Sequence, residues 1–302
     1  MGLSNRPGKQ QHHLPELTGS VGQAVPVSTS YKLFPYRPVS AALAITASVS
    51  VVIPAINEAA NIAHVLATLP SWVDQVVLVD GRSTDDTVAV ARAICPDVKV
   101  VTQHGVGKGD ALVAGFAVCS SDIIVTIDGD GSTDGREIVL FVSALAAGAD
   151  FAKGSRFANS GRSDDITRGR RYGNRLLNLL VNRMFGTHYT DLCYGFNAFW
   201  ARHLDAMAID CPGFEVETLM SIRAAKAGLR IQEIPSYERP RLHGSSNLRA
   251  IRDGWRILKV IMRERFRRGR PSAPGSATAP VGGTWLETAV VGAGPDGEQE
   301  TT

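Results

Sequence analysis

Residues 123–130 read Ile-Ile-Val-Thr-Ile-Asp-Gly-Asp, and this stretch decides the fold class. Its first five residues carry no charge and are all β-branched, a pattern typical of a strand buried on both faces of a sheet. The strand stops at Asp128, so the carboxylates of Asp128 and Asp130 follow it in a glycine turn. Such a strand favours a parallel sheet with helices on both faces.

Similar apolar runs precede this strand, and stretches with helical periodicity separate them. The predicted strands lie at 48–53, 74–79, 98–102 and 123–127, and the predicted helices at 58–69, 85–94, 108–119 and 135–147. This alternation predicts an α/β, Rossmann-like fold: a mainly parallel sheet flanked by helices, in a single catalytic domain. Ligands of such sheets bind beyond the carboxyl ends of the strands, so the residues after each strand are the candidate functional residues.

Polar residues and glycines follow each predicted strand. They are Pro54 and Glu58 after the first strand, Asp80 after the second, Lys108 after the third, and Asp128, Gly129 and Asp130 after the fourth. Two carboxylates one residue apart can share a hard cation, Mg²⁺ or Mn²⁺, whose other ligands are diphosphate oxygens. Such a cation would offset charge on a leaving diphosphate. The alternative for the acidic pair is an ordinary polar turn.

Asp80 and Lys108 each have two interpretations. Asp80 ends its strand and would accept hydrogen bonds from a ribose or a base edge, or would only stabilise the turn that follows. Lys108 stands between glycines at the start of a helix, where its cation and the backbone N–H groups can meet a phosphate. The alternative is an exposed lysine without a ligand.

The composition of the 302 residues excludes several classes of protein. With 44% hydrophobic and 20% charged residues, the chain is neither wholly disordered nor collagen-like. The four cysteines have no zinc-ligand spacing, which favours free thiols in a reduced, cytoplasmic compartment. No secretory signal is recognisable. The uncharged stretch 38–56 is interrupted by serines and a proline, so no transmembrane helix is predicted.

The chain divides by composition into four segments. Residues 1–47 and 271–302 lack periodicity and are rich in Gly, Pro, Ser, Ala or Thr, so flexible tails are expected there. The catalytic domain is expected over 48–247, and a basic amphipathic helix over 248–270. Residues 249–270 carry nine Lys and Arg against two Asp and Glu.

The apolar residues of the basic segment recur at steps of three and four. They are Leu248, Ile251, Trp255, Leu258, Met262 and Phe266, and the basic residues follow one position on. We expect a helix over 248–268 that lies on the anionic inner face of the cell membrane, with Trp255 at the level of the headgroups. The alternative is that the apolar stripe packs on the catalytic domain while the arginines face water.

Several motifs occur in the order that is found in a known enzyme family. They are Val51–Glu58, Val79–Thr87, Lys108-Gly109, Ile127–Asp130, Gly154–Arg156, Asp191 with Gly195–Phe199, and Arg241–Ser246. Over about residues 49–248 the chain thereby resembles family 2 glycosyltransferases of GT-A fold, and its downstream motifs resemble those of dolichyl- or polyprenyl-phosphate sugar synthases. The resemblance implies a divalent metal, a nucleotide-sugar donor and inversion at the sugar carbon.

The resemblance also implies roles for individual residues at the donor. Pro54, Glu58 and Asp80 would hold the nucleoside. Asp128 and Asp130 would bind the metal and the diphosphate.

Arginines would bind the phosphates of the donor or the acceptor. The resemblance implies this role for Arg156, for Arg241 with Ser246 in its loop, and for an arginine of the cluster that contains Arg170 and Arg171. Arginine suits the task because its planar guanidinium stays charged and bonds phosphate oxygens in pairs.

We therefore expect an inverting glycosyltransferase that moves a hexose from a nucleotide-sugar, of UDP-glucose or GDP-mannose type, to a polyprenyl or dolichyl phosphate. A second candidate is transfer to a soluble hydroxyl acceptor, which needs a general base such as Glu217, Glu215 or Asp191. A phosphate acceptor needs none, and the two glutamates would then only favour the start of a helix that runs to about Ala227. A non-catalytic module that binds nucleic acid is disfavoured, because the acidic turn is intact and aromatic residues do not interleave with the basic ones.

Overall fold

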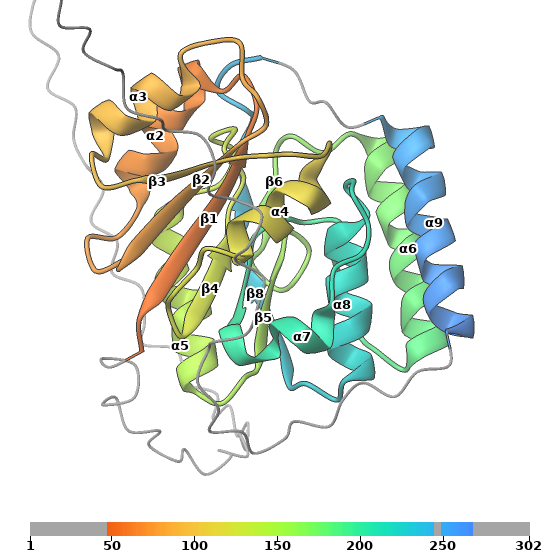
Figure 1. Cartoon of the computed structure of the whole chain (residues 1–302). Helices are drawn as coiled ribbons and strands as arrows, with labels where there is room; N and C mark the ends of the chain where they lie inside the picture. Colours follow the sequence, from red (N-terminus) through yellow and green to blue (C-terminus); the bar gives the residue numbers. More distant parts are fainter. Residues whose placement is uncertain (1–46, 245–248, 268–302) are drawn as a thin grey trace, which may run out of the picture. The chain divides into compact units, whose positions relative to one another are not determined.

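The computed structural model describes residues 47–244 and 249–267 (Figure 1). The parts of the chain that carry predictions but lie outside these ranges are residues 1–46 and 271–302, Ser246 and Leu248. A seven-stranded sheet forms the centre of the described fold, and β6 and β9 form a separate two-stranded sheet. The strands are β1 (Val49–Ala55), β2 (Gln75–Asp80), β3 (Lys99–Thr102), β4 (Ile123–Thr126), β5 (Phe151–Ser155), β6 (Arg162–Ser163), β7 (Asn197–Trp200), β8 (Ile231–Pro235) and β9 (Tyr237–Glu238).

Helices connect most of these strands. They are α2 (Ala59–Thr68), α3 (Thr87–Ile94), α4 (Lys108–Phe116), α5 (Ile138–Ala146), α6 (Arg168–Phe185), α7 (Leu204–Met207), α8 (Val216–Lys226) and α9 (Ala250–Phe266), with 3₁₀ turns at Gly135–Glu137 and Ala201–His203. None of the described helices is both long and apolar enough to cross a lipid bilayer.

The order of the strands in the large sheet is β3-β2-β1-β4-β7-β5-β8. The first four pair in parallel, whereas β7 runs antiparallel to both β4 and β5. This arrangement confirms the mainly parallel sheet expected from the sequence, in one described domain. Because β1, β2, β3 and β4 are parallel, their carboxyl ends lie at the same edge of the sheet, and the polar residues that follow them come together there.

Helices pack on both faces of the sheet, and alternate residues of β1 point into two separate cores. Val51 packs in the core that includes Ile62 of α2 and Phe141 of α5. Its neighbour Val52 points to the other face and packs in the core that includes Leu112 of α4 and residues of α8. Burial on both faces explains why the strand sequences read as continuous apolar runs.

A third core lies where α6, α8 and α9 meet. It contains Val181 of α6, Ile222 of α8, and Ile257 and Ile261 of α9, all of which are buried. The helix predicted over 248–268 therefore exists as α9, and it packs on the domain. The residues that pack are not those of the predicted apolar stripe, because Ile251, Trp255, Met262 and Phe266 remain exposed.

Candidate active site

A cavity of about 750 Å³ lies at the carboxyl edge of the parallel strands. Its lining includes most of the residues predicted from the strand ends. They are Pro54, Glu58, Lys108, Asp128, Gly129 and Asp130. Residues from the N-terminal halves of α6 and α9 also line the cavity. The cavity therefore extends from the sheet edge to these two helices.

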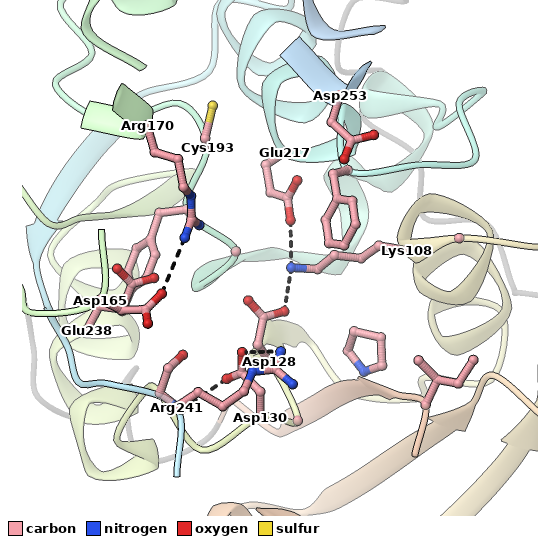
Figure 2. Close-up of a pocket in the computed structure, with 18 of the residues that line it drawn as sticks. Lys108, Asp128, Asp130, Asp165, Arg170, Cys193, Glu217, Glu238, Arg241 and Asp253 are labelled. Atoms are coloured by element: carbon pink, nitrogen blue, oxygen red, sulfur yellow. Dashed lines mark hydrogen bonds and ion pairs between the residues drawn. The ribbon is translucent and has the colours of Figure 1, made fainter. Parts of the chain in front are cut away.

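Lys108 lies between two carboxylates in this cavity, as Figure 2 shows. Its Nζ forms ion pairs with Asp128 Oδ1 and with Glu217 Oε1, the latter at 2.6 Å. Burial alone would lower the pKa of Lys108, but the two carboxylates raise it above its ordinary value, so the ammonium group stays charged. Lys108 is thus a fixed cation next to the acidic turn, and the alternative of an exposed lysine is wrong.

Glycines allow this close approach of charged groups. Gly107 has a φ of +97° and Gly109 donates its N–H to the Pro212 carbonyl at 2.8 Å, which docks the loop before α4 on the segment that leads to α8. A side chain on Gly195 would collide with Lys108 Nζ and with the Asp128 carboxylate. Gly107, Gly109 and Gly195 thus make room for the contact between Lys108 and Asp128.

Arg241 connects the second acidic residue of the turn to the first strand end. Its Nη1 donates to Glu58 Oε1 at 2.8 Å, and its Nη2 donates to Asp130 Oδ2 at 3.0 Å (Figure 2). Burial raises the pKa of Glu58, while the hydrogen bond from Asn61 and the charge of Arg241 act in the opposite direction. The planar fork of Arg241 therefore bridges two carboxylates, one on each terminal nitrogen.

The carboxylates of the turn fit a hard divalent cation in part. Carboxylate oxygens suit Mg²⁺ and Mn²⁺, and Asp128 and Asp130 both present them to the cavity. In the part of the chain that the structure describes, no three His, Cys, Asp or Glu residues gather in a way that could hold a metal. The turn could therefore supply only some of the ligands, and diphosphate oxygens would have to supply the rest.

Arg156 lines the cavity but has its guanidinium engaged by protein carboxylates. Its Nε donates to Asp191 Oδ2 at 2.7 Å, and its Nη1 lies 3.1 Å from both oxygens of Glu238. Burial would lower the pKa of Arg156, but Asp191 and Glu238 raise it. The geometry fits a residue that holds β5, β9 and the loop before β7 together around the cavity.

The other predicted arginines and Asp80 have different surroundings. Arg170 lines the cavity and pairs with Asp165 at 3.3 Å. Arg171 is exposed and its guanidinium lies over the Phe157 ring, 5.4 Å from the centroid. The carboxylate of Asp80 accepts the Ser83 N–H at 3.1 Å, so in the structure it stabilises the turn after β2. Ser246 lies outside the described residues.

One of the three candidate general bases reaches the cavity. Glu217 lines it, whereas Asp191 is fully buried and bonded to Arg156, and Glu215 is buried with its Oε1 accepting the Gly213 N–H. Glu217 is consequently the carboxylate that an acceptor in the cavity could meet.

Sequence reasoning missed several residues of the cavity wall, among them Glu238, Tyr194 and Asn174. Glu238 is separated from Arg156 by 82 positions, so no local spacing points to their contact. The Tyr194 ring lies under the Arg156 guanidinium, 4.9 Å from its centroid. Tyr194 directly precedes the predicted motif at 195–199, which is the one signal that could have found it.

Comparison of the sequence with known proteins gives matches to glycosyltransferases. Residues 50–207 match the family model described as "Glycosyl transferase family 2". Glycosyltransferase AglJ of Haloferax volcanii is 32% identical over 230 residues, which cover 75% of this chain and 74% of AglJ. An undecaprenyl-phosphate 4-deoxy-4-formamido-L-arabinose transferase of Pseudomonas syringae is 30% identical over 68% of this chain and 61% of its own length.

Solved structures of similar fold include glucosyl-3-phosphoglycerate synthase from Mycobacterium tuberculosis. Its complex with Mn²⁺, UDP-glucose and glycerol 3-phosphate superposes with a TM-score of 0.58 at 26% identity, over 74% of this chain and 82% of that one. Its complex with Mg²⁺ and UDP superposes with a TM-score of 0.58 at 25% identity, over 74% of this chain and 81% of that one.

Proposed function

The chain belongs to glycosyltransferase family 2, and from this premise we propose that it is an inverting, metal-dependent enzyme that moves a hexose from a nucleotide-sugar to a polyprenyl or dolichyl phosphate. The observation that carries the proposal is the convergence of Asp128, Asp130, Lys108 and Arg241 on one cavity. Two anionic and two cationic side chains from three distant segments meet there. A structural turn alone would need none of these partners.

The donor is assigned to the sheet edge. Pro54 and Glu58 line the cavity beside the acidic turn, and the relatives of known structure bind UDP or UDP-glucose, so UDP-glucose is our first candidate donor, with GDP-mannose as the other. A divalent cation shared by Asp128, Asp130 and the donor would take up charge that develops on the leaving diphosphate. Lys108 and Arg241 are placed to bind phosphate oxygens once their carboxylates turn to that cation.

The acceptor is assigned to the part of the cavity near α6. Arg170 lies there, at the start of a helix whose N-terminal end favours an anion. In the proposed reaction an oxygen of the acceptor phosphate attacks the anomeric carbon, and the bond from that carbon to the donor diphosphate breaks. The nucleoside diphosphate leaves with the electron pair, and the single displacement inverts the configuration. Since the phosphate is already anionic, no general base is required.

A second candidate function is transfer to a soluble acceptor. It is favoured by the likeness to glucosyl-3-phosphoglycerate synthase, whose complex contains glycerol 3-phosphate. Glu217 would then act as general base for a hydroxyl group, because it lines the cavity. Its ion pair with Lys108, at 2.6 Å, would have to open for the carboxylate to accept a proton.

A donor and acceptor matrix tests the proposal. Purified protein is incubated with UDP-glucose, GDP-mannose and other nucleotide-sugars, each with Mg²⁺, Mn²⁺ or EDTA, and the released nucleoside diphosphate is measured. Each donor is combined with a short-chain polyprenyl phosphate, with glycerol 3-phosphate, or with no acceptor. We expect metal-dependent release only with the polyprenyl phosphate. Release that requires glycerol 3-phosphate would establish the second candidate, and no release with any pair would contradict both.

A further inference from the structure

The exposed faces of α6 and α9 carry large apolar side chains that no described residue covers. Tyr172, Leu176 and Leu179 of α6 are 71%, 67% and 67% exposed. On α9, Ile251 and Trp255 are 83% and 62% exposed. Together with Met262 and Phe266, these two helices hold seven of the fifteen large hydrophobic residues that are exposed in the described chain. We call these seven residues the outer stripe.

The outer stripe points away from the domain on both helices. On α6 the buried residues Asn174, Asn178 and Val181 each lie two positions after a stripe residue. On α9 the buried Asp253, Ile257 and Glu264 do the same. Two positions correspond to about 200° around a helix, so the stripe is opposite the packed side. Helices α6 and α9 lie side by side (Figure 1) and share a core with α8, so the residues opposite their packed sides face away from the domain.

The exposed charges that α6 and α9 themselves carry are all positive. Five arginines lie on α6, namely Arg168, Arg170, Arg171, Arg175 and Arg183, and α6 has no acidic residue. Five cations lie on α9, namely Arg252, Arg256, Lys259, Arg263 and Arg265. The two acids of α9 are buried: Glu264 bonds Arg223 and Lys226 of α8, and Asp253 accepts the Arg249 N–H. Two acids from outside these helices lie at its edge, Asp210 beside Arg263 and Asp165 beside Arg170, so the exposed surface of the pair is apolar with a border that is mainly cationic.

The cavity of the candidate active site reaches this same pair of helices. Gly169 and Gly173 of α6 and Gly254 of α9 line the cavity, and a Cβ on any of them would meet no atom within 4 Å. Leu177 and Ile257 line it on the same two helices, so the wall there is apolar. The cavity thus extends to the N-terminal halves of α6 and α9, where the three glycines leave open space.

We propose that the outer stripe and its cationic border form a surface that docks on an anionic lipid bilayer, so that the cavity opens between α6 and α9 toward the lipid. Charge complementarity selects this occupant, because cations around an apolar, aromatic-bearing helix face are the features that bind anionic headgroups and the upper acyl region. A second copy of the chain would set its own cations against those of the first, which opposes self-association through this face. The docking surface includes both helices, whereas the sequence pattern pointed to the 248–268 segment alone.

Vesicle flotation of the full chain tests the proposal. The vesicles consist of phosphatidylcholine, with or without phosphatidylglycerol, at low and moderate salt. We expect flotation only with the anionic vesicles, weakening as salt rises. The variant Arg175→Gln/Lys259→Gln should bind these vesicles more weakly, by roughly fivefold for each cation removed. Wild-type protein that stays at the bottom of the gradient with anionic vesicles would overturn the proposal.

Two matched double variants test whether vesicle binding requires the outer stripe or only exposed apolar residues in general. Leu176→Ser/Leu179→Ser changes the stripe, and Val139→Ser/Leu140→Ser changes two residues of α5 that are also about half exposed, at 48% and 49%. We expect the first to abolish flotation and the second to leave it intact, with both proteins shown to be folded by thermal unfolding. Equal flotation of both variants, or concentration-dependent dimers that vanish only in the first, would contradict lipid docking.

The docking proposal and the proposed function fail in different ways. Flotation requires neither donor nor acceptor, so a protein that floats but transfers no sugar supports the surface alone. With a short, water-soluble polyprenyl phosphate, Leu176→Ser/Leu179→Ser should turn over like wild type, because neither residue lines the cavity. With a long-chain acceptor embedded in anionic vesicles, the same variant should lose most of its rate.

Discussion

The cavity and the outer faces of α6 and α9 both contain several cationic side chains, but these side chains differ in how many carboxylates they contact. In the cavity, Lys108, Arg156 and Arg241 each contact two carboxylates. On α6 and α9, Arg170, Arg256 and Arg263 also have carboxylate partners, but Arg175 and Lys259 take part in no ion pair among the described residues. Paired cations fix the geometry of a site, whereas unpaired cations keep their charge available for an external partner. This difference distinguishes the cavity, where we propose that the reaction takes place, from the outer stripe, which we propose binds a lipid bilayer.

The largest effect is expected at the acidic turn, where the paired charges serve the chemistry. Asp130→Ala should lower turnover by roughly a thousandfold or more, because the diphosphate loses its metal-mediated stabilisation. Asp128→Ala should be less severe. Steady-state kinetics measure the effect, with thermal unfolding to show that the fold is intact and Asp205→Ala, an exposed aspartate of α7, as the control. A folded Asp130→Ala protein with more than about a tenth of the wild-type rate would remove this role.

The next effect is expected on stability, at the most deeply buried of the paired cations. Arg156 is 3% exposed, and its removal leaves Asp191 and Glu238 buried without their partner. Arg156→Met should therefore lower the free energy of unfolding by about 3–5 kcal/mol. Denaturant unfolding measures the change. Arg230→Met removes an arginine that is 68% exposed from its pair with Asp150, so it should cost much less stability, and equal losses in both variants would contradict the role of burial.

A smaller effect on activity is expected when Arg241 is replaced by lysine, which keeps the positive charge but lacks the planar guanidinium group. Arg241→Lys can reach Glu58 or Asp130 but not both as Arg241 does, so kcat/KM should fall by roughly 10- to 100-fold. Stability should stay close to that of wild type, because the side chain is 18% exposed. The control is Arg239→Lys, which changes a cation paired with Asp134. Normal kinetics for the Arg241 variant would show that the two contacts have no catalytic role.

The smallest effect is expected on the helix faces. Arg175→Gln/Lys259→Gln removes two cations that have no ion-pair partner in the described chain, so the free energy of unfolding should change by less than about 0.5 kcal/mol. Turnover of a soluble acceptor should not change. Denaturant unfolding and kinetics at two salt concentrations measure both quantities. A large loss of stability would mean that these cations hold the fold, as those of the cavity do.

The sequence predicted the first half of the sheet well because its strands are buried on both faces. The four predicted strands and the helix that follows each of them correspond to β1–β4 and α2–α5, with ends that differ by a few residues, and the start of the last helix is a 3₁₀ turn. Strands β5, β7 and β8 were not predicted. Polar residues or glycine interrupt each of them, Lys153 and Gly154 in β5, Asn197 in β7, and Gln232 and Glu233 in β8, so they lack the apolar run that marks the others.

The sequence predicted the candidate site residues that directly follow a strand or begin a helix. Asp128, Asp130, Lys108 and Glu58 follow strands or begin helices, and the structure brings all four to one cavity. The partners of these residues were not predictable. The pairs of Lys108 with Glu217 and of Arg156 with Glu238 join segments far apart in sequence, and no periodicity encodes such contacts.

The insertion of β7 between β4 and β5 has a consequence for how the chain is made. A growing chain that has emerged only as far as β5 exposes the backbone edges of both β4 and β5, since their shared neighbour lies at Asn197–Trp200. Unpaired strand edges are templates for pairing with other chains. The first 155 residues should thus be an aggregation-prone intermediate on the ribosome, and expression should benefit from a chaperone that covers that edge until residue 200 has been synthesised.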